Sequence, residues 1–320
     1  MNLDIIINKN TCFYYWVQVI SNWDPYPIDP KAYQYPQDRL KIISNEQKSS
    51  LNNIKNILQS SKESRWILAE LYSGDIKRSE SKEIEELSKK LIEVFEAIWQ
   101  ESLPHLEVWL DSLKSTNFAR FNEPMKKIVD FLDSDFNLQD LYTLYLLQNS
   151  PFSGAIGHAI NNTRFILVCP PGSERPNTIN NTISIIAHEY THAVEFKSKI
   201  SRTIFKNSYD KYIGKHNIPE PDGYSWKMMY IESLVCCFAN TITGGYLRPE
   251  TYQKPRPTID EMENSFRNIK KEGRYNTNHI INWAALNILP DVEEHIEKGI
   301  KFDQQIADKL SKIFMEFYLT

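Results

Sequence analysis

The chain has 320 residues, of which 41% are hydrophobic and 24% are charged, a composition typical of a globular protein that buries its own core. Its formal net charge of -4 argues against a nucleic-acid-binding protein that works through a large positive field. Only 10 residues are glycine. Because chains with many short strands need more turn residues than this, we expect a mainly helical protein.

The N-terminal segment does not have the form of a secretory signal, since Asp4 is acidic and no long apolar stretch follows a basic start. No run of 18 or more apolar residues occurs, so we expect no membrane-spanning segment. The four cysteines, Cys12, Cys169, Cys236 and Cys237, form no C-x-x-C pair and indicate reduced thiols. We therefore expect a cytoplasmic protein, and export by a non-classical route stays open.

Helical periodicity dominates the first part of the chain, which we predict to be a helical N-terminal region over residues 1–148. Its first 30 residues are rich in aromatic side chains and end in the proline-rich stretch Asp24–Pro30, which predicts an extended connector. Apolar stripes with the spacing of a helix follow around residues 51–58, 84–98, 106–113, 128–132 and 138–145.

The pattern changes at Asn149. Two short apolar runs between residues 153 and 169 flank Asn161-Asn162, and because asparagine tolerates positive φ, the pair predicts the tight turn of a β-hairpin. Helices are predicted over about 182–198, 226–243, 258–271 and 276–287, and a final amphipathic helix ends near Phe317. The sequence thus predicts a mainly α protein of the α+β type, with a small antiparallel sheet and C-terminal helices in residues 149–320.

One motif carries chemistry. His188-Glu189-Tyr190-Thr191-His192 fits the H-E-x-x-H pattern inside the helix predicted over 182–198. Residues i and i+4 project from one helix face, so the two imidazoles can bind one Zn²⁺. Glu189 follows the first ligand and can take a proton from a water molecule on the metal. A metal also supplies the partners that two histidines need in an otherwise apolar helix.

A zinc site needs a third protein ligand. The metzincin pattern fails, because Glu195 and Ser198 stand where it has glycine and histidine. Glu232 is the favoured candidate, since a lone carboxylate in an apolar helical stretch needs a cation. Three rivals lie in the polar stretch before it, namely His216, Glu220 and Asp222, the last of which would give an aspzincin-like site.

With the motif helix and Glu232, the chain resembles the gluzincin group of zinc metallopeptidases over about Ser153 to Tyr246, most closely zinc-dependent proteases with a similar His-Glu-Tyr-Thr-His motif. The resemblance implies a zincin-like core and a His-His-Glu site for one Zn²⁺. Some gluzincins carry an acid four residues after the ligand glutamate, where it supports a ligand histidine. Here that position is Cys236, and Asn240, one turn further on, is a candidate substitute.

The resemblance also implies a side chain that stabilises the oxyanion. Tyr275 and His279 are the downstream candidates, and Tyr224 and Tyr230 are alternatives. The hairpin over residues 154–169 would bind an extended peptide by strand addition.

Together these features predict a zinc metallopeptidase that hydrolyses peptide bonds through a metal-activated water, with Glu189 as general base and a peptide or protein as substrate. No nucleic-acid or membrane partner is expected, and the oligomeric state is not predicted. Two alternatives stay open: a non-catalytic or regulatory zincin module with a structural metal, and a helical interaction protein in which the motif arises by chance.

Overall fold

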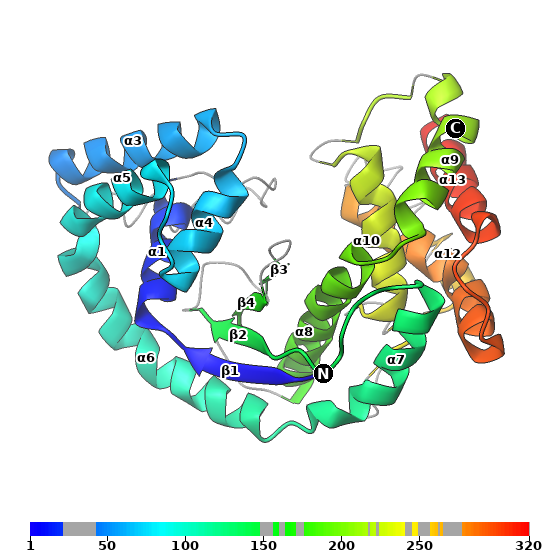
Figure 1. Ribbon diagram of the computed structural model, residues 1–320, viewed down its shortest axis with the longest axis horizontal. Coiled ribbons are helices and arrows are strands. Elements are labelled where there is room, and N and C mark those ends of the chain that lie inside the picture. Colours follow the sequence, from blue (N-terminus) through cyan, green and yellow to red (C-terminus); the bar gives the residue numbers. More distant parts are fainter. Residues whose placement is uncertain are drawn as a thin grey trace. The chain divides into compact units, whose positions relative to one another are not determined.

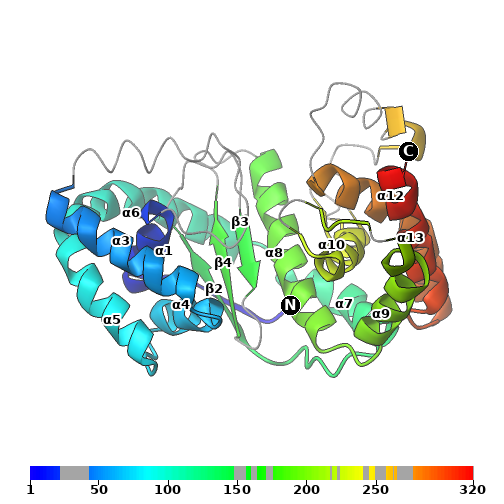
Figure 2. The ribbon, with the colours of Figure 1, turned by 90° about the horizontal axis from the view of Figure 1, so that it is seen from above.

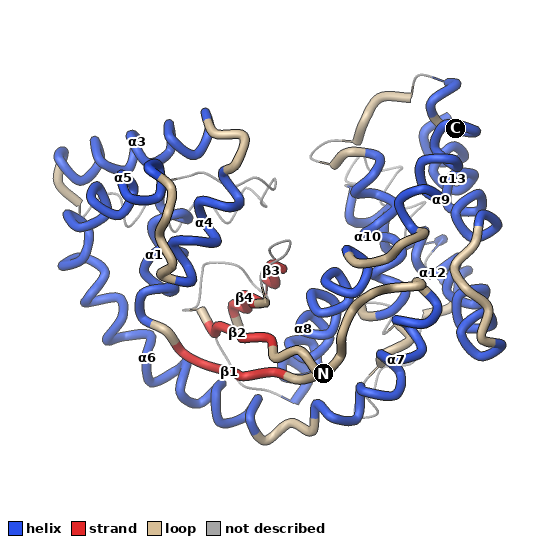
Figure 3. The backbone as a smooth tube through the Cα atoms, viewed as in Figure 1, coloured by secondary structure: helices blue, strands red, loops and turns tan. Residues whose placement is uncertain are grey.

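The computed structural model describes residues 1–21, 43–147, 156–159, 164–170, 176–216, 218–221, 224–240, 245–248, 257–261, 263–264 and 277–319. Helices dominate these residues and strands are confined to one small sheet (Figure 3), which confirms the expectation of a mainly helical protein. The predicted connector Asp24–Pro30, the Asn161-Asn162 turn and most of the helix predicted over 258–271 lie outside the described residues.

The chain forms two compact units, each built from segments that are distant in the sequence. The sheet unit consists of Leu3–Thr116 and Leu141–Ile179. The site unit consists of Met1–Asn2, Asn117–Asp140 and Asn180–Thr320. These units do not coincide with the predicted division at residue 148, because strands from both sides of that position pair within one sheet.

The sheet has four strands in the order β1-β2-β4-β3 (Figure 1). They are β1 (Leu3–Ile7), β2 (Tyr142–Leu146), β3 (Ile156–Ala159) and β4 (Phe165–Cys169). The predicted hairpin is present as the antiparallel pair β3 and β4. The prediction of an antiparallel sheet is otherwise wrong, because β1 with β2 and β2 with β4 pair in parallel. All five residues of the inner strand β4 are buried, as is typical of strands covered on both faces.

The apolar stripe predicted as a helix over residues 138–145 is instead strand β2. Tyr142, Leu144 and Leu146 are buried, whereas the residues between them, Thr143 and Tyr145, are half-buried. This alternation has the period of two that a strand shows. Five residues are too few to separate that period from the spacing of a single helical turn, so the sequence was misleading here.

The helices of the sheet unit are α1 (Lys9–Ile20), α3 (Asn45–Ser60), α4 (Ser64–Ser73), α5 (Ser79–Ser88), the 3₁₀ turn η2 (Lys89–Leu91) and α6 (Ile92–Lys114). Within this unit α1 packs against α4 and α6, α3 packs against α5, and α6 packs against β1. The predicted stripes at 51–58, 84–98 and 106–113 are confirmed as the buried faces of α3, α5 and α6.

The site unit contains η3 (Phe118–Phe121), α7 (Asn122–Phe131), most of α8 (Pro176–Phe196), α9 (Ser201–Tyr212), η4 (Gly214–His216), α10 (Trp226–Phe238), α12 (Thr277–Lys298) and α13 (Gln304–Leu319). Helix α8 starts six residues before its predicted start, with Pro176 in the first turn, where proline is favoured. Helix α10 ends at Phe238 rather than near 243, because Ala239 adopts an extended backbone with φ -144° and ψ 120°.

Helix α10 forms the centre of the site unit, with α9 and α12 packed against it and α13 against α9 and α12 (Figure 2). Ten of its 13 residues are buried. Aromatic rings fill the surrounding core, with Phe238 against Phe131 at 5.9 Å between ring centroids and Tyr230 against Phe205 at 5.1 Å. This packing gives α10 a rigid setting from which to present its few polar side chains. Among the described helices, none combines the length and the apolar character that crossing a membrane requires.

Candidate metal centre

The two histidines of the motif lie on α8 one turn apart. The helix buries an apolar face that includes Ile186, Tyr190 and Val194, spaced at i, i+4 and i+8. His188 and His192 occupy a neighbouring face and are only half-buried. Their rings meet edge to face with centroids 4.7 Å apart, so both imidazoles project into the same space.

Glu232 comes from α10, which begins after the cap residue Ser225, whose side chain accepts the backbone N–H of Met228. Between Met229 and Asn240 every residue except Glu232 is buried. The carboxylate is therefore the one polar group that this stretch of α10 presents toward an accessible space. Its side chain keeps 18% of its surface exposed, as do those of both histidines, so the cluster is open to a small ion.

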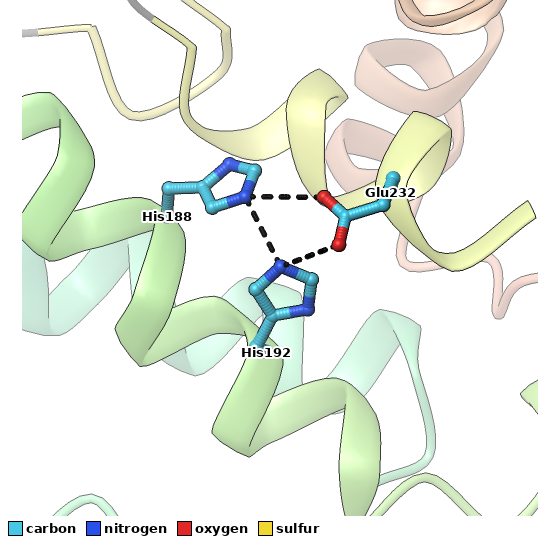
Figure 4. A group of neighbouring side chains, drawn as sticks. All are labelled: His188, His192 and Glu232. Carbon is cyan, nitrogen blue, oxygen red and sulfur yellow. Dashed lines mark hydrogen bonds and ion pairs between the residues drawn. The ribbon is translucent and has the colours of Figure 1, made fainter. Parts of the chain in front are cut away.

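The three side chains form a compact triangle (Figure 4). The Nε2 atoms of His188 and His192 are 3.1 Å apart. One oxygen of Glu232 lies 3.4 Å from His188 Nε2, and the other lies 3.4 Å from His192 Nε2. Atoms that bind one tetrahedral zinc ion at about 2.0–2.2 Å lie about 3.3–3.5 Å from each other. The two separations of 3.4 Å between a Glu232 oxygen and an Nε2 atom fit this spacing, and the Nε2–Nε2 separation of 3.1 Å is slightly shorter. Charged N–H···O hydrogen bonds are shorter than 3.4 Å, at about 2.7–2.9 Å.

A backbone carbonyl orients the ring of His188. Its Nδ1 lies 3.0 Å from the carbonyl oxygen of Ala239, which can only accept a hydrogen bond. The proton of the neutral ring is thereby placed on Nδ1, and Nε2 presents its lone pair to the cluster. Protein metal sites commonly hold a ligand histidine in this way.

Charge couples the three groups. Burial by itself would raise the pKa of Glu232, but the adjacent imidazoles of His192 and His188 hold it well below its usual range. Burial would likewise lower the pKa of both histidines, yet the pKa of His188 is raised by Cys236 and Glu232, and that of His192 is raised by Glu232. The carboxylate thus favours positive charge at the two imidazoles, whether it arrives as protons or as a metal ion.

Glu189, the predicted general base, is 8% exposed and follows His188 on α8. Its charge is one of the smaller causes that raise the pKa of His192. A second acid of the same helix, Glu195, is 3% exposed and accepts a hydrogen bond of 2.7 Å from the hydroxyl of Ser201. Burial raises the pKa of Glu195, so this group favours the neutral form more than an ordinary glutamate does.

The structure separates the favoured third ligand from its rivals. His188, His192 and Glu232 come together as predicted. Glu220 and His216 are exposed residues outside this group, and Asp222 lies outside the described residues.

The candidates for the oxyanion also differ. Tyr275 lies outside the described residues. His279 is half-buried in the first turn of α12, and burial lowers its pKa. The hydroxyl of Tyr224 donates to the side-chain oxygen of Asn278 at 3.2 Å. Tyr230 is buried and its hydroxyl is hydrogen-bonded to that of Ser311, so Tyr230 does not serve the cluster.

Sequence reasoning missed the carbonyl of Ala239, because a backbone group leaves no compositional signal. It also underestimated Cys236, whose side chain raises the pKa of His188. The spacing of four residues from Glu232 was the available signal, since it places both on one face of α10. Asn240, the predicted substitute, has a partner on α12. Its amide donates to the side chain of Asn282 at 2.5 Å.

Comparison with known protein families finds no family model that matches the chain, and comparisons with curated proteins and with solved structures find no match either. The chemistry of the cluster is therefore inferred from its residues and their geometry.

Proposed function

We propose that the protein is a zinc metallopeptidase with a zincin-like core, which acts on peptides or proteins in the cytoplasm and holds one Zn²⁺ on His188, His192 and Glu232. The observation that carries the proposal is the set of three separations of 3.1–3.4 Å between the candidate ligand atoms, which lies close to the edge length of about 3.3–3.5 Å of a zinc coordination tetrahedron. The donor set of two imidazoles and one carboxylate is one that zinc hydrolases use, and it leaves a coordination position open.

When bound, zinc supplies a Lewis acid that lowers the pKa of water and polarises a carbonyl group. The chain's own residues do the rest. His188 and His192 bind as neutral ligands through Nε2, and the contact from Ala239 fixes the ring of His188. Glu232 contributes a negative charge that offsets part of the charge of the ion.

Glu189 is the proposed general base. Its carboxylate would accept the proton of the attacking water and return it to the leaving amine. Two observations support this role: it follows a ligand on the same helix, and its charge acts on His192. The choice of a peptide bond as substrate rests on the resemblance to gluzincins.

His279 is the proposed stabiliser of the oxyanion, and Tyr275 keeps the same proposed role. Hydrogen bonds from Tyr224 to Asn278 and from Asn240 to Asn282 tie the start of α12 to the residues before and after α10. The first turn of α12, which carries His279, is thus held beside the helix that provides Glu232.

The substitution Glu189→Gln tests the proposal. It keeps the shape of the side chain and removes the base, so hydrolysis of a peptide library is expected to fall by about 10²–10⁴-fold, while zinc content measured by elemental analysis stays at one equivalent. Glu195→Gln is the matched control, because it makes the same change six residues later on the same helix, at a glutamate whose pKa is already raised. This variant should keep full activity.

Three results would contradict the peptidase. Unchanged hydrolysis by Glu189→Gln would show that Glu189 is not the general base. A wild-type protein that binds zinc and cleaves no member of the library would indicate a structural metal. A wild-type protein that binds no zinc would indicate a motif without a metal.

A further inference from the structure

We infer that two amide side chains, Asn240 and Asn282, position the zinc ligand His188 by fixing the peptide group that its ring contacts. The inference rests on the proposed zinc site and extends it to helix α12, which provides none of the three ligands. Neither asparagine touches the proposed ion, so both are positioning residues.

The peptide group in question joins Ala239 to Asn240. Ala239 has left the helical conformation, with φ -144° and ψ 120°, so its carbonyl no longer points along the axis of α10. It points to α8 instead, where it accepts from His188 Nδ1 at 3.0 Å. A small rotation of this peptide would move the carbonyl and release the imidazole ring.

The other side of the same peptide is held by Asn240. This residue is 8% exposed, and its Nδ2 donates to Oδ1 of Asn282 at 2.5 Å. The amide of Asn282 is itself oriented, because its Nδ2 donates to the backbone carbonyl of Asn278 at 2.8 Å. That bond leaves only the oxygen of Asn282 to face Asn240. Two hydrogen bonds on α12 and the covalent backbone of Asn240 therefore connect α12 to the carbonyl that contacts the ring of His188.

The backbone before this peptide is fixed separately. Tyr246 N–H donates to the carbonyl of Cys237 at 2.8 Å, and Leu247 N–H donates to that of Phe238 at 2.7 Å. Gly245 permits this return of the chain, since it has φ +58° and a Cβ there would lie 2.6 Å from the oxygen of Phe238. These contacts hold the last carbonyls of α10, whereas the Ala239 carbonyl is held through the side chain of its successor.

The matched substitutions Asn282→Ala and Asn287→Ala test the inference. Both asparagines lie half-buried on α12 and donate to the carbonyl four residues earlier, Asn287 to Trp283 at 2.9 Å. Only Asn282 also receives Asn240. The dissociation constant for zinc is measured by chelator competition, and the geometry of the site is followed by the visible absorption of the Co²⁺-loaded protein.

We expect Asn282→Ala to weaken zinc binding about tenfold, the lower end for residues that orient a ligand, and to change the Co²⁺ spectrum. Asn287→Ala should match the wild type in both. Asn240→Ala breaks the same bond from the other side, so the double variant should bind zinc no more weakly than either single variant. A merely structural role would not produce this non-additivity together with a changed spectrum.

Two results would overturn the inference while leaving the zinc site intact: equal zinc affinity in Asn282→Ala and Asn287→Ala, or fully additive losses in the double variant. If Asn282→Ala fails to fold, the comparison of Asn240→Ala with Asn287→Ala decides in the same way. A wild-type protein that binds no zinc would refute the proposed function itself.

Discussion

Two carboxylates on apolar helices, Glu70 on α4 and Glu232 on α10, show how similar sequence settings lead to different sites. Glu70 is flanked by buried apolar residues from Ile67 to Tyr72, as Glu232 is in α10. Both have a lowered pKa. What differs is the chemical nature of their partners.

Glu70 is surrounded by donors that never lose their protons. Its Oε2 accepts the backbone N–H groups of Lys77 and Arg78 at 3.0 and 2.9 Å, and its Oε1 accepts the guanidinium of Arg78. Burial would raise its pKa, but these donors lower it to about 2. The carboxylate is thus satisfied within the protein and holds the connection between α4 and α5.

Glu232 lies next to two imidazoles, each of which can lose a proton and bind a metal ion instead. Each of its oxygens lies 3.4 Å from an Nε2 atom, too far for a strong charged hydrogen bond. Among the residues that the structure describes, the negative charge therefore has no permanent cationic partner, and it favours an external one. The role of a lone acid in an apolar helix is thus ambiguous in the sequence. It depends on whether the acid contacts donors that keep their protons or a pair of imidazoles.

The largest expected effect that separates the two sites is on zinc affinity. Glu232→Gln removes the only anionic ligand, so zinc binding should weaken on the order of 100- to 1,000-fold, since four-ligand structural sites bind with about 10–16 kcal/mol in total. Isothermal titration or chelator competition measures the change. Glu70→Gln is the control and should bind zinc like the wild type. Equal losses in both variants would show that the two carboxylates do not differ in role.

A smaller effect on stability should appear in the opposite variant. Glu70→Gln removes the charged acceptor of Arg78 and of two backbone N–H groups, leaving Arg78 paired with Glu63. It should lower the free energy of unfolding at pH 7 by about 1–3 kcal/mol, measured by urea denaturation. The pKa of Glu70 falls from 4.5 unfolded to about 2 folded. Its charge therefore stabilises the protein above pH 4.5, and this contribution is lost as the pH falls toward 2.

The difference between wild type and Glu70→Gln should accordingly shrink between about pH 5 and pH 2. A difference that stays constant over this range would mean that the charge of Glu70 does not contribute to the free energy of unfolding.

The parts of the molecule that the sequence predicted depend on local spacing. The helix that carries His188 and His192 is set by neighbours within one turn, and the pairing of β3 with β4 is set by a short connection. Glu232 could be found because few acids lie in an apolar helix, although Glu70 shows that this signal alone is not sufficient.

The parts that the sequence could not predict depend on contacts between distant segments. The parallel pairing of β1 with β2 joins residues nearly 140 positions apart, and no local pattern encodes it. The same holds for the contact of His188 with Ala239 and for the bond between Asn240 and Asn282. These contacts follow from how α8, α10 and α12 pack rather than from residue spacing.

The most direct test of the central claim is anomalous diffraction at the zinc edge from crystals of the zinc-loaded protein. The proposed site predicts one strong peak within about 2.3 Å of Nε2 of His188, Nε2 of His192 and a carboxylate oxygen of Glu232. A zinc peak elsewhere in the molecule, with Glu232 turned away from the two histidines, would contradict it.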